Sequence, residues 1–405
     1  MAEHRSRWRR GGLGFAVAMT GFGVVFSGTV MVEGVPRPVA APAADAVILP
    51  GVYTGTASCA ECHRDEPEDV RGQTIGDENR IWSQSDPHSH GYKTLENDAS
   101  KAIAEKMQIA TPTESDRCLS CHAPTVPANM LHPEHFETGK AWKTREGIGC
   151  EMCHGPAGDW LEPHADENWT PTERKNHGAA GLLAKYKLID TTHLPTRAEK
   201  CVSCHLKIDP EMVKAGHPPL EFELFAYSAY LWDEDYEMHW DEAAGDAALW
   251  AAGQAAAAKA ATAQVQAWKN AGADATTAES LAAIYEKGKP IASKVTQQSF
   301  APAACATAAR ELAAVGKTAT NGLEMNIVGY GVSALGATAL AGNEEAVDAF
   351  NDVAYELEEM VAEFDEQRAK RDELLEKMVA KFNEQRAKMV ELLEKMATMA
   401  AGSAP

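Results

Sequence analysis

The first hydrophobic run of the chain lies near its N-terminus and carries no charge. It extends over 22 residues from Gly11 to Val32, and four arginines precede it, at positions 5, 7, 9 and 10. A helix of that length spans roughly 33 Å, which is enough to cross the hydrocarbon core of a bilayer. Because basic flanks stay on the cytoplasmic side, residues 1–33 are predicted to be a signal peptide or an N-terminal membrane anchor.

The pattern leaves both alternatives open. The sequence APAAD at 41–45 offers a small-residue cleavage site after Ala43, whereas the apolar run is long for a signal peptide. Residues 34–50 are rich in Pro and Ala and are predicted to form a linker. In either case the rest of the chain is expected in the periplasm or on the outer face of the cytoplasmic membrane.

The hydrophobic pattern changes again within the body of the protein. Residues 51–240 are interrupted by Pro and Gly and predict only short helices, such as Ser100–Met107. Residues 241–342 are dominated by Ala and predict a bundle of closely packed helices, in which Gly331 and Gly336 mark either turns or tight contacts. The expected fold is mainly α, with a loop-rich domain followed by an Ala-rich bundle.

Residues 343–405 predict a long amphipathic helix or a coiled coil. The sequence FDEQRAKRDELLEKMVAK at 364–381 recurs as FNEQRAKMVELLEKMATM at 382–399, and a repeat of 18 residues returns each side chain to the same helix face. Glu and Lys residues four apart, such as Glu366 and Lys370, add stabilising pairs. The apolar stripe packs either on the bundle or against a partner or a second copy.

The charge of the chain restricts its partners. Its 59 acidic and 38 basic residues give a formal net charge of −21. Such a charge opposes binding to a nucleic-acid backbone and attracts proteins with basic docking surfaces. We therefore expect redox or other protein partners with basic surfaces and no nucleic acid.

Eight of the nine cysteines occur in four C-x-x-C pairs, and a histidine directly follows each pair. Paired cysteines also suggest disulfides or structural zinc, but neither explains the adjacent histidine. The sequence C-x-x-C-H attaches c-type haem through two thiols and supplies the proximal iron ligand. We predict four covalently bound haem c groups, attached at Cys59, Cys62, Cys118, Cys121, Cys150, Cys153, Cys201 and Cys204, with proximal ligands His63, His122, His154 and His205.

The sixth iron position of each haem needs a ligand from elsewhere in the chain. Nine further histidines lie between residues 88 and 239, within the stretch that carries the four motifs, and none occurs after it. A second imidazole suits electron transfer, whereas an open position lets a small molecule bind. The candidates are His88, His90, His132, His135, His164, His177, His193, His217 and His239.

Several segments between about residues 51 and 312 resemble the multihaem cytochromes of the cytochrome c-554 family. They include WSQSDPHSHGYKTL at 82–95, GIGCEMCHGPAGDWLEPH at 147–164 and AGHPPLEFEL at 215–224, in the family's order. This resemblance implies an extracytoplasmic electron carrier with closely stacked, mostly bis-histidine haems. It also implies distal roles for His88, His164 and His217, and a less well supported one for His239 in the pair HW.

Two positions depart from the family pattern. Many relatives carry a fifth haem site near the segment CATAAREL at 305–312, where this chain keeps Cys305 but has Ala308 and Ala309 at the positions of the second cysteine and the histidine. We interpret this as a degenerate fifth haem site. Relatives also often have a histidine where Pro210 stands. If that histidine served the fifth haem, both were lost together. If it served a retained haem, one iron here is five-coordinate or uses His193 in its place.

These features predict a tetrahaem electron carrier between a redox enzyme or quinol-oxidising complex and an acceptor, with no catalytic residue. One alternative is an enzyme whose single open haem acts on a small nitrogen or sulfur compound. Another is a haem subunit that its C-terminal helix docks into a larger membrane complex or filament.

Overall fold

The computed structural model describes residues 48–63, 68–70, 73–76, 78–132, 146–166, 168–230, 245–319 and 321–341, together with 370, 377 and 381. The predicted N-terminal signal or anchor lies outside the described residues. So do nearly all of the predicted linker and C-terminal helix, and two candidate ligands, His135 and His239.

Short helices make up the first part of the chain, up to residue 230. The α-helices here are α2 (Thr56–Ala60), α3 (Glu78–Gln84), α4 (Gly91–Thr94), α5 (Asp98–Lys106), α6 (Asp116–His122), α7 (Cys150–His154), α8 (Leu161–Ala165), α9 (Pro171–Tyr186), α10 (Leu194–His205) and α11 (Pro210–Ala215). The 3₁₀ and π turns are η2 (Pro87–His90), η3 (Pro112–Glu114), η4 (Ala128–Met130), η6 (Ala157–Asp159) and η7 (Ala226–Tyr230). Strands β1 (Glu68–Val70) and β2 (Gln73–Ile75) pair antiparallel. The prediction of a mainly α fold is confirmed.

Local caps explain where these helices begin. Helix α5 begins two residues before the predicted Ser100, because the side chain of Asn97 accepts a hydrogen bond from the Ser100 amide and caps the first turn. Helix α11 begins with Pro210, and the Asp209 side chain caps it. Pro210 therefore has a local structural role at a helix start.

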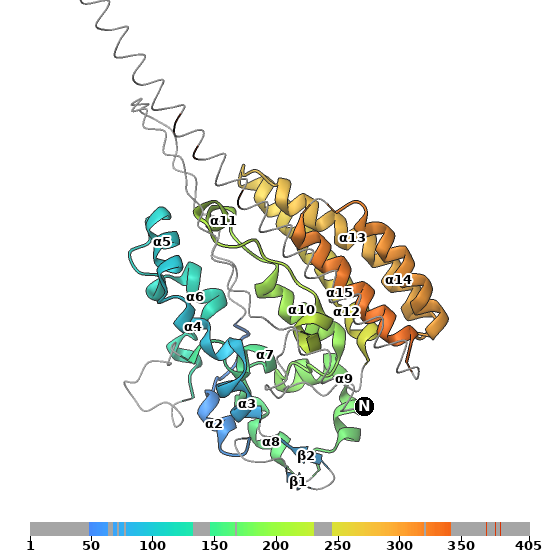
Figure 1. Cartoon of the computed structure of the whole chain (residues 1–405). Coiled ribbons are helices and arrows are strands. Elements are labelled where there is room, and N and C mark those ends of the chain that lie inside the picture. The colour runs from blue at the N-terminus through green and yellow to red at the C-terminus, as the bar shows by residue number, and fades with distance from the viewer. Residues whose placement is uncertain are drawn as a thin grey trace, which may run out of the picture.

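The Ala-rich region forms four long helices that lie side by side (Figure 1). They are α12 (Asp246–Asn270), α13 (Thr276–Gln297), α14 (Pro302–Gly316) and α15 (Gly322–Ala339). Their small residues let the helix backbones approach closely. A Cβ atom at Gly331 of α15 would lie 2.4 Å from the Trp250 indole nitrogen, and one at Gly253 would lie 2.8 Å from the Cβ of Leu224. Gly331 is thus a tight helix contact and not a turn.

The largest hydrophobic core extends from this bundle into the first part of the chain. Helix α10 packs against α12, and its residues Ala198, Val202 and Leu206 belong to the same buried cluster as Trp250. Phe222 and Leu224 join that cluster from the segment after α11. The core is therefore continuous across the composition change near residue 240.

By contrast, the described parts of the chain before α10 contain small apolar clusters. Tyr53, Val126 and Met152 form one, and Leu95, Leu119 and Ala123 form another. Three large buried side chains contribute only about 5–9 kcal/mol together, whereas ordering the backbone costs about 1–2 kcal/mol for every residue. This agrees with the expectation that bound macrocycles supply the apolar interior of this part.

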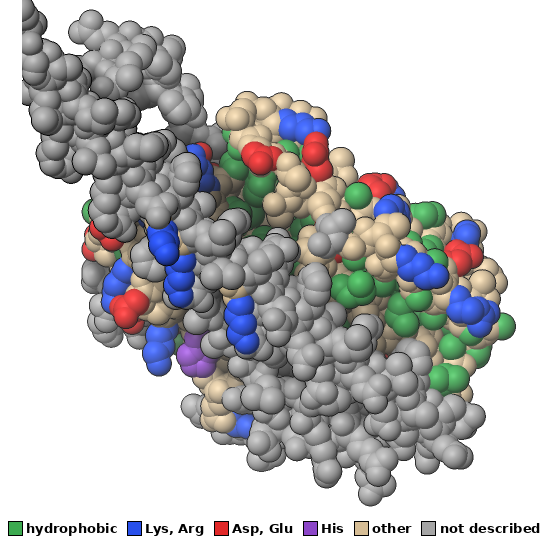
Figure 2. Space-filling model, turned by 45° about the horizontal axis from the view of Figure 1, so that its top comes forward, with side chains coloured by type: hydrophobic (Ala, Val, Ile, Leu, Met, Phe, Trp, Pro, Cys, Tyr) green, Lys and Arg blue, Asp and Glu red, His purple; other side chains and the backbone are tan. Residues whose placement is uncertain are grey.

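The described surface mixes both charge signs. Figure 2 shows Lys and Arg side chains interspersed with Asp, Glu and apolar side chains on the face that it presents. Among the helices of the described ranges, none combines the length and the apolar character that a bilayer span requires.

Replacement of Gly331 by leucine tests the tight contact between α15 and α12. The added side chain meets Trp250 and Leu312, so we expect a loss of about 1–3 kcal/mol in the free energy of unfolding, measured by urea titration. Ala313→Leu on the exposed face of α14 is the control and should change that free energy by less than about 0.5 kcal/mol. Equal stability of the two variants would contradict the contact.

Candidate haem-binding site

All four C-x-x-C-H motifs lie on helical turns. The motif histidine is the last residue of α6, α7 and α10. In the first motif, the amides of Cys62 and His63 donate to the carbonyl of Cys59, which closes the same kind of turn. Residues three apart lie on one side of a helix. The two thiols of each motif can therefore reach one macrocycle, with the imidazole beside them.

The four attachment segments are neighbours in a definite order. The thiols of Cys59 and Cys150 are hydrogen-bonding neighbours, and α7 packs against both α2 and α10. The thiols of Cys121 and Cys204 are likewise neighbours. The resulting order places the first, third, fourth and second motifs in sequence, so that the second motif lies at one end.

Three proximal histidines each face a distal candidate across a short gap. The ring centroids are 6.3 Å apart for His63 and His164, 6.0 Å for His88 and His205, and 6.3 Å for His122 and His217. An ion bonded to one nitrogen of each ring at the usual length of about 2 Å would separate the centroids by roughly 6 Å. The spacing of all three pairs therefore fits an iron between two imidazoles.

Each pair joins segments that are far apart in the sequence. His164 comes from α8 and faces the first motif, while His88 comes from η2 and faces the fourth. His217 follows α11 and faces the second motif. Iron bound between these rings would cross-link the chain, and haem attachment and folding would then be coupled.

Hydrogen bonds orient five of these six rings, and in four of them the bonded ring atom is Nδ1. Two acceptors are carboxylates: Asp86 lies 2.9 Å from Nδ1 of His88, and Glu78 lies 2.8 Å from Nδ1 of His63. The others are backbone carbonyls, namely those of Trp160 and Leu161 for His164, Pro218 for His217 and Gly91 for His122. With Nδ1 engaged, Nε2 is left to bind a metal, which is the usual arrangement of ligating histidines.

Burial favours the uncharged form of three of these six rings. Burial and the neighbouring His88 lower the pKa of His205 to about 4, and burial also lowers the pKa of His122 and of His164. Burial acts in the same direction on His88, but the hydrogen bond and charge of Asp86 outweigh it and raise the pKa of His88. Uncharged imidazoles at neutral pH have a lone pair ready for iron.

A buried carboxylate ties the first attachment segment to the third. Glu151, inside the third motif, is 3% exposed, and its side chain accepts hydrogen bonds from the amides of Thr54, Gly55 and Ala157. Burial raises the pKa of Glu151, although these hydrogen bonds oppose the change. Glu151 thereby fixes the segment before α2 against α7.

The helical bundle supports the His122 and His217 pair. The Trp268 indole donates to the carbonyl of Ile208, and the side chain of Gln264 accepts a hydrogen bond from the backbone amide of Ile208. Asp209, the next residue, pairs with Arg117 on α6. The segment that carries His217 is thus fixed to α12 on one side and to α6 on the other.

The remaining candidates have other positions. His90 and His193 are exposed, and Nδ1 of His193 lies 2.8 Å from the Thr196 hydroxyl. His177 packs edge-on against Tyr186, and the amide of His132 donates to the Tyr53 carbonyl. His239, predicted as a distal ligand, falls outside the described residues, and its role stays a prediction. Cys305 is fully buried in the bundle core.

Sequence reasoning missed the residues that hold the ligands. Asp86 lies two residues before His88, and an acidic residue at that spacing is the one local pattern that could have identified Asp86 as a partner of the ring. Glu78 lies 15 positions from His63 and Glu151 lies 97 from Thr54, so no local pattern connects them.

Comparisons with known proteins support a resemblance to c-type cytochromes. The family model described as cytochrome c554 and c-prime matches residues 58–155. Cytochrome c-554 of Nitrosomonas europaea is 21% identical over 194 residues, which cover 45% of this chain and 71% of that protein. These matches support a c-type cytochrome. No solved structure matches the chain.

A c-type cytochrome binds haem covalently through C-x-x-C-H, and electron transfer is the usual role of such proteins. The matched residues contain the first three motifs, whereas the fourth lies beyond them on α10. The histidine of that fourth motif faces His88, which lies within the matched residues.

The ring planes predict distinct electron paramagnetic resonance (EPR) signals from the oxidised protein. The planes are 14° apart for His63 and His164, 66° for His122 and His217, and 90° for His88 and His205. Perpendicular imidazoles leave two iron d orbitals nearly degenerate and give a strongly anisotropic low-spin signal, whereas parallel ones give a rhombic signal. We expect both kinds in one low-temperature spectrum; rhombic signals alone would contradict the perpendicular pair.

Replacement of Glu151 by alanine tests the link between the first and third attachment segments. Three buried amides lose their acceptor, at about 1–3 kcal/mol each, so the free energy of unfolding should fall by about 3 kcal/mol or more. Urea titration of the holoprotein measures it. The exposed Glu61→Ala is the control, and a Glu151→Ala midpoint equal to that of the control would refute the link.

Proposed function

We propose that the protein is a tetrahaem c-type cytochrome that carries electrons on the outer side of the cytoplasmic membrane. The observation that carries the proposal is the set of three histidine pairs at 6.0–6.3 Å, each combining a motif histidine with a distant one. Bound haem supplies a one-electron Fe(III)/Fe(II) couple. Two imidazoles on one iron leave no position for a substrate, which favours a carrier over an enzyme.

The order of the attachment segments supports transfer along the molecule. Neighbouring thiols link the first motif to the third and the fourth to the second, and α7 contacts α10 between them. Groups held on adjacent segments exchange electrons without large motions of the chain. The continuous core under α10 anchors the fourth of these segments to the bundle.

Location and partners belong to the same proposal. Haem c attachment through C-x-x-C-H and the apolar run behind four arginines both favour an extracytoplasmic protein. The net charge of −21 favours redox partners with basic docking surfaces, which would associate at rates that fall with ionic strength. The 18-residue repeat near the C-terminus is proposed to mediate self-association or docking into a larger complex.

The number of haems also follows from the pattern of cysteines. Cys305 and Ala308 both lie buried on α14, three residues apart, as Cys118 and Cys121 lie on α6. Ala308 offers no second thiol and Ala309 no iron ligand, so we propose a degenerate fifth site that binds no haem. We also propose His239 as the distal ligand opposite His154.

Intact mass tests the haem count. We expect an intact mass equal to that of the chain, less any cleaved N-terminal segment, plus the mass of four haems. Cys305→Ala should leave the number of haems unchanged. Cys201→Ala combined with Cys204→Ala is the matched positive control and should remove one haem. A preparation without covalent haem would end the proposal.

EPR tests the choice between carrier and enzyme. Four low-spin signals are expected, whereas one high-spin signal that changes on addition of nitrite or hydroxylamine would favour an enzyme with an open haem.

A further inference from the structure

The hydrogen-bond partners of the rings divide the three described histidine pairs into two classes. In the pairs His63–His164 and His88–His205, one ring bonds to a carboxylate, from Glu78 and Asp86 respectively. In the pair His122–His217 both rings bond to neutral carbonyl oxygens, those of Gly91 and Pro218. The three pairs thus offer iron similar ligands with different charges behind them.

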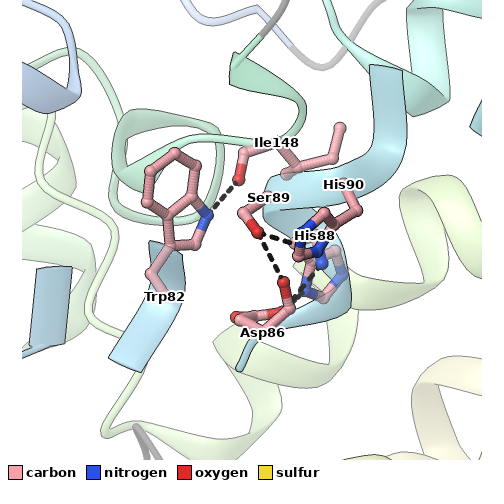
Figure 3. Close-up of polar contacts among 6 residues, drawn as sticks. All are labelled: Trp82, Asp86, His88, Ser89, His90 and Ile148. Atoms are coloured by element: carbon pink, nitrogen blue, oxygen red, sulfur yellow. Dashed lines mark hydrogen bonds and ion pairs between the residues drawn. The ribbon is translucent and has the colours of Figure 1, made fainter. Parts of the chain in front are cut away.

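Asp86 is held firmly in its position behind His88 (Figure 3). It is 6% exposed, and the same Oδ1 atom accepts hydrogen bonds of 2.9 Å from both the amide and the ring of His88. Its carbonyl accepts from the amide and the hydroxyl of Ser89. The neighbouring Ile148 fixes the segment further, since its amide donates to the carbonyl of His88 and its carbonyl accepts from Trp82.

Glu78 has the corresponding position behind His63. Its Oε2 atom lies 2.8 Å from Nδ1, and about a third of its side chain is exposed. Water screens a partly exposed charge more than a buried one. The effect of Glu78 on its ring should therefore be in the same direction as that of Asp86 and smaller.

A carboxylate behind a ligating imidazole changes the iron through the ring. Hydrogen bonds to ionised acceptors are roughly twice as strong as neutral ones and raise the basicity of the ligand. A more basic ligand and a nearby negative charge favour Fe(III), which has one positive charge more than Fe(II). The reduction potential at that iron therefore falls.

Other charges near the pairs also affect the balance. The ion pair of Arg117 with Asp209 lies on the segments of the His122–His217 pair, and Lys106 of α5 donates to the carbonyl of Ala215 near His217. Lys200 lies near Cys153, Cys201 and Cys204 and opposes Asp86, but burial lowers the pKa of its ammonium group. Asp86 bonds to the ligand ring directly, so we expect its charge to dominate.

We propose that Asp86 and Glu78 are potential-determining residues, which keep the irons of the His88–His205 and His63–His164 pairs at lower reduction potentials than that of the His122–His217 pair. This rests on the proposed electron-carrier function. Because the second motif lies at one end of the order of attachment segments, electrons shared among these three irons would collect there. The site at Cys118 and Cys121 is then the exit toward the acceptor.

The decisive experiment is a redox titration of the full-length holoprotein followed by EPR, comparing wild type with Asp86→Asn. Asparagine keeps an oxygen for both hydrogen bonds and is an equally good helix cap, but it carries no charge. We expect the reduction equilibrium of the strongly anisotropic signal to shift about tenfold toward Fe(II), which is 59 mV for one electron. The reduction equilibrium of the rhombic signal, from the 14° pair, should not change.

Two further variants separate this effect from general ones. Glu78→Gln should instead shift the reduction equilibrium of the rhombic signal toward Fe(II), by less than tenfold. Asp98→Asn removes a fully exposed carboxylate, whose nearest cation is Lys101 at 3.4 Å, and should shift neither signal.

Three results would overturn the proposal. One is an unchanged potential of the anisotropic signal in Asp86→Asn. Another is loss of that low-spin signal in the variant, which would make Asp86 a purely structural support. The third is a wild-type titration in which the 66° pair is not the first of the three to be reduced. All three results can be distinguished from failure of the proposed function, because that failure would appear as an intact mass without covalent haem.

Discussion

The arrangement of this protein depends on pairs of imidazoles that face each other across a gap the width of a metal ion. Three such pairs join η2, α8 and the loop after α11 to motif helices elsewhere in the sequence. The side-chain clusters around them are too small to hold these segments by burial alone. Metal ligation is directional and strong, so a few bonds can replace an extended core.

The helical bundle has a complementary role. Its core is conventional and well filled, and it continues through α10 to the fourth attachment site. Trp268 and Gln264 fix the segment that carries His217, while Glu151 fixes the first attachment segment to the third. A predicted distal histidine must approach within bonding distance of an iron that would be held by another segment. The geometry of the ligands therefore depends on the packing of the bundle that positions these segments.

Charge placement adds a further level of organisation. Similar pairs of imidazoles differ in what lies behind them, and a fixed, buried carboxylate such as Asp86 affects the iron more than an exposed one, because water screens it less. Surface charge acts differently, through encounter rates with partners. A carrier can thus tune potentials from within while its surface is adapted to docking.

The sequence by itself determined the cofactor type and the mainly α fold, since C-x-x-C-H and Ala-rich periodicity act over a few residues. The same motifs predict the proximal ligands, which stay a prediction. The sequence also suggested His88, His164 and His217 as distal ligands, through family resemblance. Only the tertiary structure decided which of these faces which motif, and that Asp86, Glu78 and Glu151 support the site. Those contacts connect residues up to 117 positions apart, as for His88 and His205, and local patterns carry no information about such distances. Gly331 shows the same limit, because only the position of Trp250 on a neighbouring helix distinguishes a close contact from a turn.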